Sequence, residues 1–383
     1  MHKIVQEAIV KARLHNLSHN LAHVDIAGLD EIFQNRQPVL VGADIRSTYC
    51  FLLRAEEQRD GDTWALRLLE CPERGLAPKA TIADFGTGLR AGQKQALPGV
   101  PCRGDVFHAL HVLAPVATFL ENRAYQTIDC LDKLEHKKTR LLRGARRDQR
   151  RQVHSLGRKI TILLKEQPKA IDLADDVAVL TRWLRSDIFT VSGLPYADRV
   201  ALFDFILAEL QARASLCAHR LGPVCTLLRN HRDQILAFAW QLDEDLSNLA
   251  AQYQVPVEVV RELLDLQTSD TRQPQRCQKE AALRQRLRGR FYLIEQAVRE
   301  LSQQVVRASS IIENINSRLR SYFFLRRHVG AGYLELLQFF LNHRRFLRSE
   351  HRERVGKSPA ELLTGQPHPH WLEMLGYSQA CPN

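Results

Sequence analysis

The sequence predicts an α/β fold in which a mixed sheet with flanking helices is interrupted by a large all-α insertion. Short apolar and β-branched runs, separated by turn residues, dominate residues 24–84 and indicate strands. From about residue 106 to 307 these runs disappear, and apolar residues recur at helical spacing, as in the stretch 203–210. Apolar helical patterns continue after the insertion, so the sheet domain is expected to be split along the chain.

Three strands in succession open the sheet domain. Residues 24–33 alternate in polarity, residues 38–42 form a short apolar run, and residues 48–53 are rich in aromatic and β-forming side chains. The polar residues 34–37 and the turn-forming residues 44–47 lie between these runs. The three strands are therefore expected to be joined by tight turns.

A helix and a fourth strand follow. Asp62 or Thr63 can cap a helix that begins there, and residues 79–84 predict a strand that ends on Asp84. Three strands, a helix and a further strand in this order resemble an RNase H-like core, in which the first and fourth strands lie side by side.

These patterns divide the chain into five parts. We expect a helical tail over residues 1–20, the first part of an RNase H-like core over 21–112, an all-α insertion over 113–305, the second part of the core over 306–346 and a basic tail over 347–383. Within the insertion, clusters of Pro, Gly and polar residues predict breaks between helices near residues 167–168, 192–195, 222–223 and 268–278.

The composition favours a nucleic-acid partner. The net charge of +11 and the isoelectric point near 9.4 attract phosphate polyanions, and most of the basic residues are Arg, whose planar fork binds phosphate. The sequence contains neither an apolar run of membrane-spanning length nor a signal-peptide core. We therefore expect a cytoplasmic, nucleoid-associated protein without a membrane partner.

Neither the cysteines nor the histidines predict a zinc site. The eight cysteines are scattered with no C-x-x-C pair, which fits reduced thiols in mostly buried positions. His15, His19 and His23 lie four apart in the N-terminal tail but have no Cys or acidic partner, so they indicate a polar helix face.

Three acidic residues stand in surroundings that suit metal-dependent phosphoryl transfer. Asp30 lies in the first expected strand, Asp84 ends the fourth, and Glu313 lies in a helical segment after the insertion. Mg²⁺ prefers carboxylate and water oxygens, and a pair of such ions can activate an attacking hydroxyl and stabilise the leaving oxygen. Asp25 and Asp44 compete with Asp30 for the first position, although Asp44 more simply starts the turn before the third strand.

Several short motifs, in this order and spacing, resemble bacterial insertion-sequence transposases of the DDE class. The group with the greatest resemblance carries a large helical insertion between the second Asp and the Glu, as the hAT transposases also do. The motifs fall between residues 24 and 365 and are LDEIF at 29–33, PVLVG at 38–42, DFG at 84–86, DVFH at 105–108, SIIENINSRL at 310–319, LNHR at 341–344 and GKSPAEL at 356–362.

The resemblance implies Mg²⁺-dependent DNA cleavage at transposon ends and strand transfer into target DNA. Asp30, Asp84 and Glu313 are then the catalytic residues and the ligands of two Mg²⁺ ions, with Mn²⁺ as a substitute and Asp30 as the shared ligand. The D-x-x-H motif implies that Asp105 and His108 support the site. Such an enzyme is expected to act as a homo-oligomer on transposon-end and target DNA.

Positive charge is densest between residues 137 and 151. On a helix these side chains repel one another unless an anion is near, so contact with DNA phosphates is expected, with a solvated or coiled-coil helix face as the alternative. The residues expected to contact DNA, here and after the insertion, are Lys137, Lys138, Arg140, Arg143, Arg146, Arg147, Arg150, Arg151, Arg318, Arg344 and Arg345.

Two other functions remain open, and so does the choice of the third acidic ligand. The chain can be a catalytically inactive or truncated transposase remnant that binds DNA as a regulator, or an RNase H-like nuclease that cuts without joining. About 24 residues precede the first expected strand, fewer than the usual N-terminal helix-turn-helix needs, so we expect a chain without this module. Glu300 is the nearest upstream competitor of Glu313.

Overall fold

The computed structural model describes two compact units. The described residues are 2–143, 149–268, 274–307, 310–324, 330–349 and 352–377. The first unit combines residues 1–107 with residues 306–383, and the second consists of residues 108–305.

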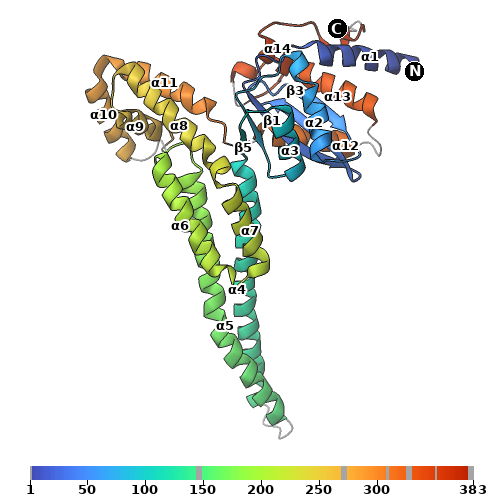
Figure 1. Ribbon diagram of the computed structural model, residues 1–383. Coiled ribbons are helices and arrows are strands. Elements are labelled where there is room, and N and C mark those ends of the chain that lie inside the picture. Colours follow the sequence, from blue (N-terminus) through green and yellow to red (C-terminus); the bar gives the residue numbers. More distant parts are fainter. Residues whose placement is uncertain are drawn as a thin grey trace, which may run out of the picture. The chain divides into compact units, whose positions relative to one another are not determined.

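The first unit is built on a five-stranded mixed sheet, which confirms the predicted α/β class (Figure 1). The strands are β1 (Ile26–Gln34), β2 (Gln37–Asp44), β3 (Cys50–Ala55), β4 (Ala80–Ala83) and β5 (Cys102–Gly104), in the spatial order β3-β2-β1-β4-β5. β1, β2 and β3 are antiparallel neighbours, whereas β4 pairs in parallel with both β1 and β5. The first and fourth strands therefore lie side by side, as the sequence predicts.

Helices α2 (Gly61–Leu69) and α3 (Thr87–Ala96) cover one face of the sheet. Leu29 of β1 shares a core there with Trp64 of α2. The two helices are in close contact because α3 carries glycine where they meet: a side chain at Gly92 would collide with Trp64. The 3₁₀ turn η1 (Pro72–Arg74) follows α2.

Helices α12 (Ser310–Phe324) and α13 (Ala331–His343) cover the opposite face, although they follow the insertion in the chain. Ile32 of β1 and Ile82 of β4 belong to one apolar cluster with Ile315 of α12. The sheet thus lies between two helical layers, one from each part of the split unit.

The N-terminal helix and the C-terminal segment pack around α13. They form α1 (His2–Ser18), the 3₁₀ turn η5 (Arg352–Arg354), α14 (Pro359–Thr364) and α15 (Trp371–Met374). Ala12 of α1 and Leu375 meet Phe339 of α13 in a small apolar cluster.

The expected polar helix face in the N-terminal tail is wrong for His19. Its Nε2 atom lies 3.1 Å from Nε2 of His343, and its ring meets Tyr49 edge-on. His343 is buried and bonds through Nδ1 to the carbonyl of Phe339 at 2.8 Å. His19 therefore faces the body of the unit and helps to dock the start of the chain.

All described residues of the second unit outside the connections are helical. The helices are α4 (Val106–Arg143), α5 (Arg150–Trp183), the π-helical turn η3 (Leu184–Ile188), α6 (Tyr196–Ala214), α7 (Ala218–Asn230), α8 (Arg232–Tyr253), α9 (Val257–Thr268), α10 (Pro274–Leu287), the 3₁₀ turn η4 (Arg288–Arg290) and α11 (Phe291–Gln304). This confirms the expected all-helical stretch. Among the described helices, none is long and apolar enough to cross a membrane.

Two of the expected breaks inside the insertion are wrong. Pro168 lies inside α5 and Pro223 inside α7, and each helix continues past its proline. A proline removes one backbone donor, which long, well-packed helices tolerate as a local bend. The break at 192–195 is correct: the buried guanidinium of Arg199 donates to the carbonyls of Ile188, Thr190 and Leu194 and fixes this connection.

Candidate functional site

Asp30 and Asp84 are neighbours at one end of the sheet. The parallel register of β1 and β4 pairs Leu29 with Ala83; Asp30 is the next residue of β1, and Asp84 directly follows the end of β4. Side chains alternate along a strand, so Asp30 shares the α12 face of the sheet with Ile32. The sheet therefore brings these two predicted ligands to the place where the pairing of β1 with β4 ends.

Helix α12 lies directly over this part of β1. Gly28, two residues before Asp30, has no side chain, and a Cβ atom there would lie 2.5 Å from Cγ1 of Ile312. One helical turn later, Nδ2 of Asn316 donates to Oδ2 of Asp30 at 2.6 Å. Two residues along a strand and four along a helix span similar lengths, so the two contacts are in register.

Glu313 belongs to the same helix turn as these contacts. It directly follows Ile312, and residues three apart on a helix are neighbours, which places Glu313 beside Asn316. Its side chain is half-buried, and Oε2 lies 3.9 Å from Nη1 of Arg320. The helix around Glu313 thus returns to the two strands.

The pKa of Asp30 is raised by burial and by neighbouring carboxylates. Burial raises this pKa to about 7, the hydrogen bond from the backbone amide of Glu31 opposes the rise, and the charges of Asp84, Glu313 and Asp105 raise it further. That amide donates to Oδ1 of Asp30 at 2.8 Å. The carboxylates of Asp84, Glu313 and Asp105 therefore lie near enough to Asp30 to affect its charge.

Asp105 is connected to the end of β4. Its backbone amide donates to the carbonyl of Ala83, and its buried Oδ1 accepts from the amide of Phe107 at 2.7 Å, where α4 begins. Asp84 makes a similar local bond, since its Oδ1 accepts from the amide of Gly86 at 2.9 Å. His108 is the first residue of the second unit, so its role at the site stays a prediction.

The competing acids have other roles or other places. Asp44 accepts from both the amide and the hydroxyl of Ser47 at 2.6 Å, which confirms that it serves the turn. Asp25 forms an ion pair with Lys79 at 3.1 Å. Glu300 lies on α11 in the second unit and accepts from Gln296.

The donor set suits a hard divalent cation in its chemistry. The carboxylates near Asp30 offer oxygen ligands, and Asn316 adds a buried Oδ1 atom that has no hydrogen-bond partner among the described residues. No group of three or more His, Cys, Asp or Glu residues in the described part of the chain is arranged to hold a metal ion.

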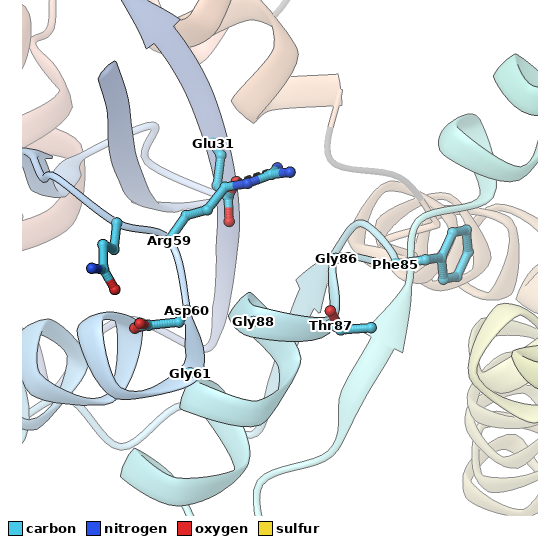
Figure 2. A pocket seen from close by; sticks show the side chains of 9 residues that line it. Glu31, Arg59, Asp60, Gly61, Phe85, Gly86, Thr87 and Gly88 are labelled. Carbon is cyan, nitrogen blue, oxygen red and sulfur yellow. Dashed lines mark hydrogen bonds and ion pairs between the residues drawn. The ribbon is translucent and has the colours of Figure 1, made fainter. Parts of the chain in front are cut away.

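A pocket of about 740 Å³ opens on the other side of this sheet edge (Figure 2). The first residues of α2 and α3 line it, together with Glu31 and Phe85. Arg59 reaches across to Glu31 at 3.1 Å, and Phe85 points away from this pair. Since Glu31 follows Asp30, the two side chains leave β1 on opposite faces.

The expected DNA contacts fall in two places. Those of the basic run lie at the end of α4 and the start of α5, which run side by side (Figure 1), and the described ones are largely exposed; Arg146 and Arg147 lie outside the described residues. The other group lies in the first unit. Arg318 stacks over Phe346, Arg344 over Phe340, and Arg345 is paired with Glu361 at 2.8 Å.

The sequence did not predict a role for two residues of the site. Gly28 admits α12, and Asn316 binds Asp30. A glycine in an alternating strand signals a close approach of another element, and that signal was present.

No protein-family model, curated protein or solved structure matches this chain.

Proposed function

We propose that this chain is a DDE transposase that cleaves DNA at transposon ends and joins the freed 3′ end to target DNA. The observation that carries the proposal is the place of Asp30 and Asp84, where the pairing of β1 with β4 ends, and the contact of α12, the helix of Glu313, with Asp30 through Asn316. The strand order β3-β2-β1-β4-β5, with β2 antiparallel to β1, supports an RNase H-like core. The motif order in the sequence supports the same class.

Each acid would have a defined task. Asp30, Asp84 and Glu313 would hold two Mg²⁺ ions, with Asp30 as the shared ligand and Asp84 and Glu313 as the outer ligands. When bound, the ions supply Lewis acidity at the scissile phosphate. Asp105 would support the site by fixing the backbone next to Asp84, because its backbone amide donates to the carbonyl of Ala83. The raised pKa of Asp30 fits this task, because a cation would replace the proton that its acidic neighbours favour.

The basic run would hold DNA through its phosphates. Lys137 and Arg140 at the end of α4 and Arg150 and Arg151 at the start of α5 are exposed. Arg150 and Arg151 lie at a helix N-terminus, where the helix dipole disfavours cations unless an anion compensates. We propose that the chain works in the cytoplasm, as a homo-oligomer on DNA.

Charge-removing variants of the three acids test the proposal. Asp30→Asn, Asp84→Asn and Glu313→Gln keep the side-chain volume, so each should abolish Mg²⁺-dependent nicking of a supercoiled plasmid while DNA affinity stays nearly unchanged. Mn²⁺ should restore little activity, because a neutral amide is a weaker ligand.

Glu300→Gln is the matched control. It makes the same change on an exposed helix of the second unit and should nick like the wild type. Loss of nicking in Glu300→Gln but not in Glu313→Gln would show that the third ligand is misassigned. If none of the four changes matters in a protein that nicks with Mg²⁺, the three-acid site is wrong.

A catalytically silent DNA-binding remnant is the second candidate. The exposed basic residues at the end of α4 and the start of α5 favour it, because DNA binding needs no metal site. It predicts DNA binding with no nicking in either metal. A nuclease that cuts without joining would nick but give no strand-transfer product with a pre-cleaved end and a target plasmid.

A further inference from the structure

We infer that Asn316 is a positioning residue that holds the Asp30 carboxylate in the orientation in which it binds a divalent cation. This inference rests on the proposed function of the same site. Nδ2 of Asn316 donates to Oδ2 of Asp30 at 2.6 Å, and the backbone amide of Glu31 donates to Oδ1 at 2.8 Å. With one donor on each oxygen, rotation of the carboxylate would break both bonds, so its plane is fixed.

The position of Asn316 follows from the packing of α12. Ile312 enters the space above Gly28, and Asn316 comes one turn later over Asp30. Glu313 lies between them in sequence, on the adjacent edge of the same helix face. One helix therefore contributes both a candidate ligand and the residue that orients another candidate ligand. Groups that hydrogen-bond a metal ligand from outside tune its orientation and its affinity for the metal.

Packing alone does not account for an amide at this position. Asn316 is fully buried, and among the described residues its Oδ1 atom has no hydrogen-bond partner. An unpaired buried acceptor lowers stability, and an apolar side chain of the same size would avoid that cost. The bond to Asp30 is thus the contact that explains the amide.

The test uses full-length Asn316→Leu, which keeps the branched shape of the side chain and removes the donor. Mn²⁺ binding to the DNA-free protein is followed by the electron paramagnetic resonance signal of free Mn²⁺, and nicking kinetics and thermal unfolding are measured alongside. We expect the Mn²⁺ dissociation constant to rise about 10–100-fold and kcat for nicking to fall similarly, with KM for DNA unchanged. Asn314→Leu, at an exposed position on the same helix, is the matched control and should behave like the wild type.

The possible outcomes separate the two proposals. A folded Asn316→Leu protein with wild-type Mn²⁺ affinity overturns the positioning role, even if its melting temperature falls, because a purely structural residue would give that result. If Asn316→Leu does not fold, Asn316→Ala is measured in the same way. A wild-type protein that neither binds Mn²⁺ nor nicks DNA overturns the proposed function, and the role of Asn316 with it.

Discussion

At the scale of single residues, Gly28 decides how closely α12 approaches β1. A Cβ atom there would lie 2.5 Å from Cγ1 of Ile312 and 2.6 Å from Cδ1 of Ile45, well inside contact distance. The helix that carries Glu313 would have to move away from the strand that carries Asp30. The missing side chain is therefore part of how the acids come together.

Gly28→Ala should reduce nicking more than it reduces stability. Overpacking costs about 1–3 kcal/mol, which lowers the melting temperature by about 2–12 °C for a unit of this size. Displacement of Glu313 by a fraction of an ångström should lower kcat by about tenfold or more, because misplacement of 1 Å can cost about 100-fold. Thermal unfolding and single-turnover nicking measure the two effects.

Gly157→Ala is the control for this change. Gly157 lies inside α5, and a Cβ atom there meets only Nζ of Lys138 at 3.9 Å, so alanine should leave nicking unchanged and favour the helix slightly. Adding Ile312→Ala and Ile45→Val to Gly28→Ala removes the atoms that the new methyl group would meet. Failure of these further changes to recover any activity would argue against the steric explanation.

The sequence predicts part of the site residue by residue. Asp30 stands within the first strand pattern and Asp84 at the end of the fourth, and parallel pairing of those strands suffices to bring them together. Asn316 gives no such signal, because an amide in a helix has many uses and its partner lies far away in the chain. Its role depends on the register of α12 on β1, which only the folded structure defines.

At the scale of elements, the docking of α1 depends on neutral histidines. Burial lowers the pKa of His19 to about 4, and the charges of Arg74, His15 and His368 lower it further. Burial also lowers the pKa of His343 to about 3 against the hydrogen bond to Phe339, and the neighbouring histidines add to the shift. The unfolded chain binds protons near pH 6.5, before either histidine does so in the folded state.

The stability of the first unit should therefore fall as the pH drops below about 6.5. There the unfolded state binds more protons, so the free energy of unfolding decreases by up to about 1.4 kcal/mol per pH unit for each histidine. Asp30 acts in the opposite direction, since its raised pKa favours the folded state at lower pH. Urea titrations at pH 7.5, 6.5 and 5.5 measure the sum.

Comparison of variants isolates the histidine contribution. His19→Gln combined with His343→Gln removes both titrations, so stability should fall less between pH 6.5 and 5.5 than in the wild type. His23→Gln changes an exposed histidine and should keep the wild-type pH dependence. An unaltered dependence in the double variant would assign the acid sensitivity to other groups.

The sequence predicts some helices and strands correctly and others not, for physical reasons. β1 to β4 carry apolar or alternating patterns and lie where the sequence predicts strands. β5 is three residues long, which is too short to show an alternating pattern of polar and apolar residues. The prolines in α5 and α7 predict breaks because a prediction from the local sequence takes account of the missing backbone N–H group. It does not take account of the tertiary packing that keeps each helix continuous.

At the scale of the whole molecule, DNA binding should depend strongly on salt. Arg140, Arg143 and Arg151 are exposed at the ends of α4 and α5. Changing all three to Gln should weaken binding similarly for unrelated DNA sequences. The slope of log affinity against log salt should become less steep by about 0.9 for each lost phosphate contact. DNA affinities measured by fluorescence anisotropy at salt concentrations from about 50 to about 300 mM provide this slope.

A control with the same change in net charge uses Arg284, Arg286 and Arg299. These arginines lie on α10 and α11 and form ion pairs with Glu280, Glu262 and Glu295. Their replacement by Gln should leave the slope near the wild-type value. Equal slopes in both triple variants would make the basic run a merely solvated helix surface.

The split of the first unit also governs when it becomes complete during synthesis. Helices α12 and α13 cover the sheet face that carries Ile32, Val41 and Ile82, yet they follow the whole insertion in the chain. A nascent chain that ends before residue 306 leaves this apolar face uncovered, while the insertion already has its own core. Domains that close through such distant segments fold slowly, because the loop must be ordered before the contacts form. A ribosome that stops early would thus release an incomplete, aggregation-prone sheet that lacks Glu313, so truncated products would be inert toward DNA cleavage.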